Sequence, residues 1–439
     1  MGLGICVRAK LRNNKPQSAE KAIEDIVGAL PDAISDPVMT ECLDVVEAED
    51  KLLVTLHPAA EMLEISAEHG FVVASTKTST AGPGFHAAVV DVLDRLGKAC
   101  SLAWMWDEEG SPDETGYALD RDYAKLQQAM ASQFRAVAEA IGDHLEESDQ
   151  DERTTYLNMA PLNGSMLQPV THNQIVSPIG AHSRGWLTKA ATEQGAASLA
   201  PDFYPWWTRE RTPREWAKLA TVLMWSELRW RPPTGEHEER LMRLALRAAE
   251  EAGPELARFG PTPGDLEEIS TLLSVEEEAD VPPPRDQGFG LFRGDAHYTG
   301  LGEWTFRAPA SMLDEVEEDD EGNVSIVLAM PGRTLRMSGI EFESDGDKPV
   351  DRHQILQDIQ AAAKGPYEQV ERDDLVGMLE IAEPGEEESW HVLSASLAAD
   401  SHLAFFTLAY RDATDEAWAR RVIASVQPPA GPSAELDDD

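Results

Sequence analysis

The chain of 439 residues contains little cysteine and no long hydrophobic run. Its three cysteines, Cys6, Cys42 and Cys100, lie far apart and form no C-x-x-C pair. This spacing excludes a dense disulfide framework and a zinc site recognisable from sequence, and it favours a reducing compartment. No stretch of 18 apolar residues occurs, and the N-terminal residues lack the pattern of a secretory signal. We therefore expect a soluble, cytosolic protein with no membrane span.

Positive charge is also scarce. Lys and Arg number 37 against 80 Asp and Glu, which gives a formal net charge of -43. Such a surface repels the phosphates of nucleic acids and of anionic membranes, so we expect neither as a partner. Two interpretations of the charge stay open: a surface that binds another protein, with a basic one favoured, or general solubility in a salty cytoplasm.

What the chain does contain is ample material for packed cores. Apolar residues make up 42% of the sequence, which includes 11 Trp, and the length predicts two to three domains. The parts that we predict are an α+β domain at 1–147, an irregular connection at 148–185, a helical domain at 186–275, an acidic and proline-rich linker at 276–287, an α+β domain with an antiparallel sheet at 288–428, and a disordered acidic tail at 429–439.

The first part alternates strand and helix patterns. Apolar residues recur with period two from Leu3 to Leu11, which predicts a half-buried strand. Further strands are interrupted by turn signals at His57-Pro58 and His69-Gly70, and a short strand is expected at 100–106. A stripe of apolar residues then predicts a long helix from Tyr123 to Ile141. This order indicates helices on one face of a mostly antiparallel sheet.

The central part carries clear helix signals. Thr212-Pro213-Arg214-Glu215 is a capping box with proline at the first helical position, and Pro232-Pro233 is expected to end that helix. A second helix is expected from Thr234, packed against the first, and a third from Thr262-Pro263. No 34-residue repeat is present, so a helical solenoid is not supported.

The last part predicts two paired strands within 323–342 that turn at Pro331-Gly332, a helix near 353–364, three strands, and a closing helix capped by Thr414. This order, and the final "HLAFFTLAYRDATDEAWARRVIASV", resembles the PsbP/DcrB-like domains, including those of Eag-type secretion chaperones. The resemblance covers about 145 residues. It implies a largely noncatalytic domain that binds other proteins.

The motif "STAGPGFH" offers a possible ligand loop at Gly82, Gly84 and His86. It matches neither G-x-G-x-x-G nor the Walker pattern, and Pro83 removes one backbone N–H from any phosphate cradle. The favoured interpretation is a sharp strand-to-helix turn, with Phe85 in the core and His86 exposed in the first helical turn. The alternative is a site in which His86 acts as an acid–base group.

No complete catalytic or metal motif accompanies this loop, so we assign no catalytic residue, no metal ligand and no cofactor. A set of Ser79, His86 and Asp91 or Asp94 lacks a nucleophile elbow around the serine. The acidic runs at 314–323 and 343–351 do not have the spacing of a calcium loop.

A second candidate site lies between residues 201 and 247, where nine Lys or Arg stand against seven Asp or Glu. Tryptophan and arginine are the residue types that anchor protein interfaces. The candidate binding residues are Trp206, Trp207, Arg209, Arg211, Trp230 and Arg231. The alternative is a helical-hairpin core that contains the same residues.

The prediction is therefore a noncatalytic protein-binding component, such as an adaptor, a chaperone or an immunity-type protein. It would use acidic faces or the Trp/Arg-rich segment. Two alternatives stay open. One is an enzyme with a site between Gly82–His86 and the connection at 160–185, where His172 or His182 could assist. The other is a structural subunit of a larger assembly.

Overall fold

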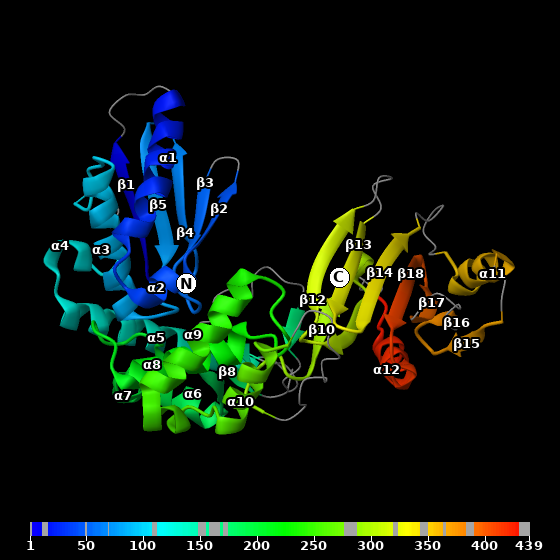
Figure 1. Cartoon of the computed structure of the whole chain (residues 1–439). Coiled ribbons are helices and arrows are strands. Elements are labelled where there is room, and N and C mark those ends of the chain that lie inside the picture. Colours follow the sequence, from blue (N-terminus) through cyan, green and yellow to red (C-terminus); the bar gives the residue numbers. More distant parts are fainter. Residues whose placement is uncertain are drawn as a thin grey trace, which may run out of the picture.

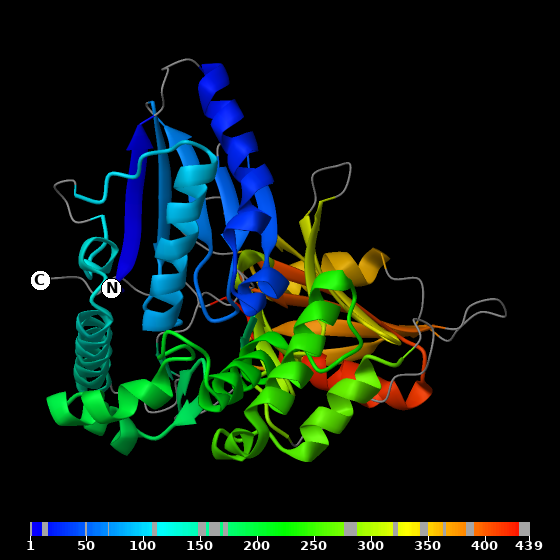
Figure 2. The same cartoon turned by 60° about the vertical axis from the view of Figure 1, so that its left-hand side comes forward.

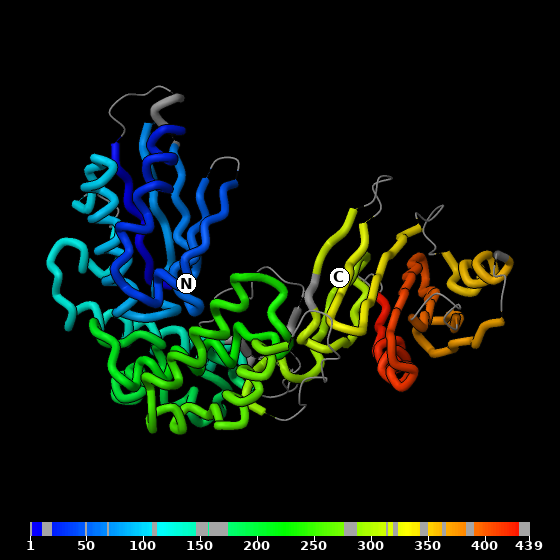
Figure 3. The backbone as a smooth tube through the Cα atoms, viewed as in Figure 1, coloured from blue at the N-terminus to red at the C-terminus, as the bar shows by residue number. Residues whose placement is uncertain are grey.

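The computed structural model of the chain contains two large antiparallel sheets and a group of helices that forms the base between them (Figures 1 and 2). The smooth trace runs from the blue N-terminal sheet through green helices to the yellow and red C-terminal sheet (Figure 3). Among the described residues, no helix is both long and apolar enough to cross a membrane. The structure describes residues 2–10, 16–48, 51–68, 70–107, 112–147, 155–157, 167–169, 174–275, 288–318, 324–342, 350–362, 366–382 and 390–429.

Some expectations fall outside these residues. They are the linker at 276–287, the tail from residue 430, His172 with much of the connection around it, half of the acidic run at 314–323 and most of the run at 343–351.

The N-terminal sheet has the strand order β1-β5-β4-β3-β2, and all of its pairs are antiparallel. The alternation expected for the first strand is confirmed, since Ile5, Val7 and Ala9 are buried while Arg8 and Lys10 are exposed. The strands are β1 (Gly4–Lys10), β2 (Asp44–Ala48), β3 (Lys51–Thr55), β4 (Leu63–Glu68) and β5 (Phe71–Lys77).

Helices cover one face of this sheet, as Figure 2 shows for α1 and α3. The helices of this part are α1 (Pro16–Ala33), α2 (Pro37–Cys42), α3 (Pro83–Ala99), α4 (Tyr117–Asp120) and α5 (Tyr123–Glu147). The predicted long helix is thus confirmed as α5. Because the second face of an antiparallel sheet can meet water, one helical layer is enough to bury the apolar residues of the strands.

The expected strand at 100–106 is wrong. The segment meets the outer edge of β1 through an isolated bridge between Ala9 and Trp104. The indole N–H of Trp104 donates to the carbonyl of Leu93 at 2.7 Å, so the side chain packs on α3. The segment therefore anchors that helix instead of extending the sheet.

The three predicted central helices are confirmed as α8, α9 and α10. The predicted capping box forms at Thr212 with Glu215, and α10 has a further one, at Thr262 with Asp265, that was not predicted. The first helix ends before Pro232, because α8 continues as one π-helical turn and Leu228 is extended. The helices here are α6 (Arg184–Ala190), α7 (Glu193–Phe203), α8 (Pro213–Val222), the π-helix (Leu223–Glu227), α9 (Glu236–Ala252) and α10 (Pro263–Leu272).

These central helices divide between two hydrophobic cores. Phe203 of α7 packs in the core of the N-terminal sheet, together with Phe134 of α5. Leu219 and Leu244, from α8 and α9, share a core with Phe406 of the C-terminal sheet. The described helices therefore connect the two sheets and form no separate core between them.

The C-terminal sheet contains seven antiparallel strands in the order β12-β13-β14-β18-β17-β16-β15. The paired strands turning at Pro331-Gly332 are confirmed, and Gly332 has φ 77°. The strands are β12 (Leu313–Glu318), β13 (Val324–Met330), β14 (Arg333–Glu341), β15 (Glu368–Glu371), β16 (Val376–Ala382), β17 (His391–Ala399) and β18 (His402–Tyr410).

Smaller elements complete this part. Helix α11 (Arg352–Ala362) lies near the predicted position, and α12 (Glu416–Ser425) closes the chain. Thr414 does not cap α12; it donates its N–H and hydroxyl to Asp412, which begins a preceding 3-10 turn at Ala413–Asp415. A three-stranded sheet joins β11 (Thr305–Pro309), β10 (Asp295–Thr299) and β7 (Leu167–Pro169), and another joins β6 (Thr155–Tyr156), β8 (Ile175–Ser177) and β9 (Gly180–His182).

The predicted fold class is therefore confirmed. The chain combines an N-terminal five-stranded antiparallel sheet, a central helical region and a C-terminal seven-stranded antiparallel sheet. The two outermost strands of the larger sheet, β12 and β15, are acidic and were missed, because their residues are too polar to give a clear apolar alternation.

Candidate functional site

The glycine loop and the segment around Trp206 pack directly against each other. The N–H of Gly84 donates to the carbonyl of Trp206 at 2.9 Å, and the N–H of Trp206 donates to the carbonyl of Ala81 at 2.9 Å. A Cβ atom on Gly84 would lie 2.1 Å from Cδ1 of Trp206, and Gly82 has φ 109°. Close packing and backbone conformation thus account for both glycines, and the Gly84 amide is not available to a phosphate.

Buried Lys218 of α8 binds the backbone that leads to Trp206. Its Nζ donates to the carbonyls of Pro201 at 2.8 Å and Tyr204 at 2.6 Å, and it lies 3.4 Å from a carboxylate oxygen of Glu215. Burial lowers the pKa of Lys218 to about 8, although Glu215 opposes this shift. Because these acceptors occupy its ammonium group, Lys218 has a structural role: it holds the chain at Pro201 and Tyr204 against α8.

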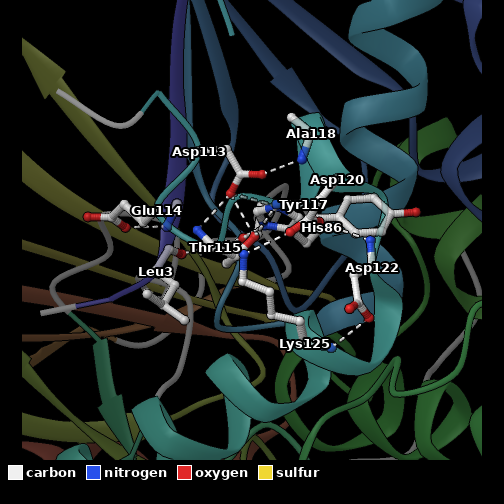
Figure 4. A network of polar contacts seen from close by, with 12 residues as sticks. Leu3, His86, Asp113, Glu114, Thr115, Tyr117, Ala118, Asp120, Asp122 and Lys125 are labelled. Atoms are coloured by element: carbon white, nitrogen blue, oxygen red, sulfur yellow. Dashed lines mark hydrogen bonds and ion pairs between the residues drawn. The ribbon is translucent and has the colours of Figure 1, made fainter. Parts of the chain in front are cut away.

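His86 lies in a buried network of polar side chains that includes Thr115 and Asp113 (Figure 4). Its Nδ1 is 2.8 Å from the hydroxyl of Thr78, and its Nε2 is 3.2 Å from both the hydroxyl of Thr115 and Oδ1 of Asp113. The expected exposure of His86 is wrong, since its side chain is 0% exposed. The loop before α4 covers this side of α3 and supplies the two partners of Nε2.

Asp113 is the centre of the same network. It accepts hydrogen bonds from the N–H and hydroxyl of Thr115 at 2.8 and 2.7 Å and from the N–H of Ala118 at 2.7 Å. Burial alone would raise the pKa of Asp113, but the hydrogen bond and attraction from His86, with those other donors, lower it to about 2. The network therefore holds the 113–118 loop against β1 and α3.

The hypothetical set of Ser79, His86 and a nearby aspartate is not brought together. The hydroxyl of Ser79 accepts from the N–H of Leu3 at 3.1 Å, whereas His86 contacts Thr78. Asp91 and Asp94 instead form ion pairs with Arg121. The buried Thr–His–Asp arrangement has the residue types of a catalytic triad, but its enclosure keeps a substrate from reaching it.

A pocket of about 380 Å³ lies where the two candidate sites meet, and no residue of the His86 network lines it. Its walls come from the start of α2, the first turns of α3, the segment 206–211 and Trp216 of α8. We call it the Arg211 pocket. Its volume is within the range of small-molecule sites, about 300–1,000 Å³.

Arg211 lies in the wall of this pocket against Trp206. The centre of its guanidinium is 3.5 Å from the centroid of the Trp206 ring, and its Nη2 is 3.1 Å from Oδ1 of Asp36. The side chain is only 7% exposed, and burial lowers its pKa to about 10. Its Nη1 is buried and has no hydrogen-bond acceptor among the described residues.

The remaining Trp/Arg candidates do not form one surface. Arg209 is 60% exposed and also lines the pocket, 3.7 Å from Asp91. Trp207 is half-buried, stacks on Tyr204, and accepts a hydrogen bond from the Tyr123 hydroxyl at its carbonyl.

Trp230 and Arg231 belong to the other core. Trp230 is 1% exposed, and the guanidinium of Arg293 lies 3.4 Å from its ring centroid. Arg293 also pairs with Asp265 and Glu268 of α10, at 2.7 and 2.8 Å. Arg231 is 2% exposed and makes two hydrogen bonds to Glu238, at 2.7 and 2.8 Å. Trp206, Trp230 and Arg231 are therefore packing residues, which removes them from any contact surface in this conformation.

The acid–base groups of the enzyme alternative are also separate. His182 stacks on Trp186 with centroids 3.9 Å apart and contacts the hydroxyl of Ser177 at 2.6 Å. Burial lowers the pKa of His182 to about 4. No histidine, cysteine or lysine lines the Arg211 pocket. Within the described part of the chain, no group of three or more His, Cys, Asp or Glu could hold a metal ion.

Comparison with known proteins adds no identity. No family model matches the chain, and no curated protein matches it. A solved structure from Bacteroides thetaiotaomicron is similar over 31% of this chain and about half of its own length, 49%, with 11% identity and a TM-score of 0.25. A similarity of this size carries no argument about function.

Proposed function

We propose that the protein is a noncatalytic protein-binding component, of the adaptor, chaperone or immunity type, that binds a basic partner through its acidic sheet edges. The observation that carries this proposal is the outer edge of the C-terminal sheet. Glu315, Val316, Glu317 and Glu318 of β12 are all exposed, and Val316 is 60% exposed.

The backbone of β12 gives this edge its binding capacity. The strand pairs with β13 on one side, and no described strand pairs with its other side (Figure 1). An unpaired edge can accept an added strand through main-chain hydrogen bonds. The glutamates oppose a second acidic copy of the chain and favour a strand that carries Lys or Arg.

The N-terminal sheet ends in a similar way. Its edge strand β2 carries exposed Asp44, Val46 and Glu47, and Val46 is 49% exposed. By contrast, β1 at the opposite edge has further partners: the N–H of Met105 donates to the carbonyl of Arg8, and the N–H of Cys6 donates to the carbonyl of Pro112. The edge strands β12 and β2 are thus both acidic, and each carries an exposed valine.

The C-terminal element order also supports the proposal. It includes β13, β14, α11, three further strands and α12, which is compatible with the resemblance to PsbP/DcrB-like domains. We include membership of that largely noncatalytic group in the proposal for residues 288–428.

The test is a tagged pull-down from the native host at low and high salt, with mass spectrometry of the bound proteins. We expect a stoichiometric basic partner that is lost at high salt, because rim charges are screened. The variant Glu315→Lys/Glu317→Lys/Glu318→Lys should lose it. The matched control, Glu250→Lys/Glu251→Lys/Glu267→Lys, changes the same charge at exposed sites on α9 and α10 and should retain it.

Two outcomes would refute the edge as the binding surface. One is a wild-type protein that purifies alone at low salt. The other is an equal loss of the partner in both triple variants, which would indicate a nonspecific effect of net charge.

A further inference from the structure

We propose that the Arg211 pocket is a binding site for a carboxylate carried on a small apolar or aromatic body, and that Arg211 receives the carboxylate. The site lies between α2, α3 and α8, whereas the sheet edges considered above lie elsewhere. This inference therefore does not rest on the proposed function.

The first argument is the incomplete hydrogen bonding of Arg211. A guanidinium has five N–H donors in a planar fork, and a buried charge is costly unless it is paired and hydrogen-bonded. Here Nη2 reaches one oxygen of Asp36, which also accepts from the N–H of Met39 at 3.0 Å. Nη1 has no acceptor in the described structure. Nη1 is closed to water in this conformation, so the guanidinium would turn toward the pocket to meet a ligand carboxylate, with which it forms parallel hydrogen bonds.

The second argument is that the other arginines of the pocket are less suitable. Arg95 donates from Nη1 to the carbonyl of Ala33 at 3.2 Å. Arg209 is 60% exposed, so its charge is screened by water. Arg211 combines burial, stacking on Trp206 and a donor without an acceptor.

The charge of the walls favours a carboxylate over a phosphate. Asp36, Asp91 and Glu210 line the pocket beside its three arginines, so there is no excess positive charge for a dianion. The Gly84 N–H, which could have joined a phosphate cradle, is occupied by the carbonyl of Trp206. A single negative charge matches Nη1 of Arg211, a charged donor that lacks an acceptor in the described structure; the neutral indole N–H of Trp206 also lacks one.

The rest of the wall favours an apolar body. Met39, Val92 and Ala88 line the pocket together with half-buried Trp216. The centre of the Arg211 guanidinium is 5.7 Å from the centroid of the Trp216 ring, so a ligand can contact the ring and the cation together. The volume of about 380 Å³ suits a body the size of an aromatic amino acid.

The experiment compares matched acids and amides by calorimetry and thermal unfolding of the full chain. Benzoate and benzamide form one pair; N-acetyl-phenylalanine and its amide form a second pair, which mimics the C-terminal residue of a peptide. We expect each acid that binds to do so at least about tenfold more tightly than its amide. Binding of benzoate identifies a free aromatic acid as sufficient, and binding of N-acetyl-phenylalanine alone identifies a peptide terminus as the source.

Variants then locate the site. Arg211→Lys keeps the charge but lacks the planar fork, and we expect affinity to fall about tenfold. Ala88→Phe should fill the pocket without altering Arg211, and we expect binding to be lost while the melting temperature is retained. Arg243→Lys, at a side chain 65% exposed on α9, is the control and should bind as the wild type does.

The proposal is overturned if neither acid binds at millimolar concentration, if acids and amides bind equally, or if inorganic phosphate stabilises the protein as well as the acids do. Binding that survives in both Arg211→Lys and Ala88→Phe would overturn the location. None of these outcomes depends on whether a basic partner is captured in the pull-down.

Discussion

Asp113→Asn tests the central role of the buried network around His86. The substitution keeps the size of the side chain but removes its charge. It also places one amide NH₂ where a carboxylate oxygen accepted hydrogen bonds from Thr115 or Ala118. Because the Asp113 side chain is only 3% exposed, water cannot replace the lost acceptor.

The magnitude follows from the lowered pKa of Asp113. The pKa falls from 3.8 to about 2, and each unit corresponds to about 1.4 kcal/mol. The carboxylate therefore contributes about 2 kcal/mol to folding at neutral pH. The folded protein binds this proton less readily than the unfolded chain does. The contribution is thus complete above the unfolded pKa near 4, and it is lost as the pH falls through about 2.

The assay is urea unfolding at several pH values, with hydrogen exchange of peptides that cover residues 112–118. We expect Asp113→Asn to lose about 2 kcal/mol at pH 7, and the difference from wild type to shrink between about pH 4 and pH 2. Asp120→Asn, at an exposed carboxylate beside Lys125, is the control and should change little. A variant as stable as wild type at pH 7, or a difference that does not depend on pH in this range, would refute the reasoning.

Two further predictions concern packing and a buried ion pair. Gly84→Ala should destabilise the protein by at least about 2 kcal/mol in thermal or urea unfolding, because the new Cβ would lie 2.1 Å from the Trp206 ring. Gly28→Ala, at an exposed position of α1 where nothing lies within 4 Å of the new Cβ, should instead stabilise the protein by up to about 1 kcal/mol. Equal changes in stability for the two variants would contradict the packing argument. Arg293→Met should cost about 3 to 5 kcal/mol, since it leaves two carboxylates of α10 without their buried partner. Arg258→Met, at a pair that is 55% and 34% exposed, should cost at most about 1 kcal/mol, and a similar loss in both variants would argue against the special role of Arg293.

Local patterns predicted the elements that have a strong local signal. The alternation in β1, the capping box of α8, the start of α10 near Thr262-Pro263 and the Pro331-Gly332 turn depend on neighbouring residues, and all of them are present. Edge strands β12 and β15 were missed because an edge exposed to water needs no apolar alternation. The segment at 100–106 was misread because its apolar residues pack on α3, and the local pattern does not reveal that contact.

The candidate site was found in two pieces that local patterns could not join. Gly84 and Trp206 are far apart in sequence, and their contact depends on the return of the chain after α7. Arg211 was noted for its residue type, but its unpaired donor and its stack on Trp206 are properties of the folded chain. Thr78, Asp113 and Thr115 were not predicted as partners of His86, since isolated threonines and aspartates carry no distinctive signal.

The sequence by itself determined the fold class, the strong acidity and the positions of most helices and strands, because period, capping and charge are set by composition and by neighbouring residues. Only the tertiary structure decided that the central helices divide between two cores, that Trp206 and Trp230 are buried, and that Gly84 and Arg211 meet at one pocket. The physical reason is that burial and hydrogen-bond partners depend on contacts between distant segments, and sequence periodicity does not record those contacts.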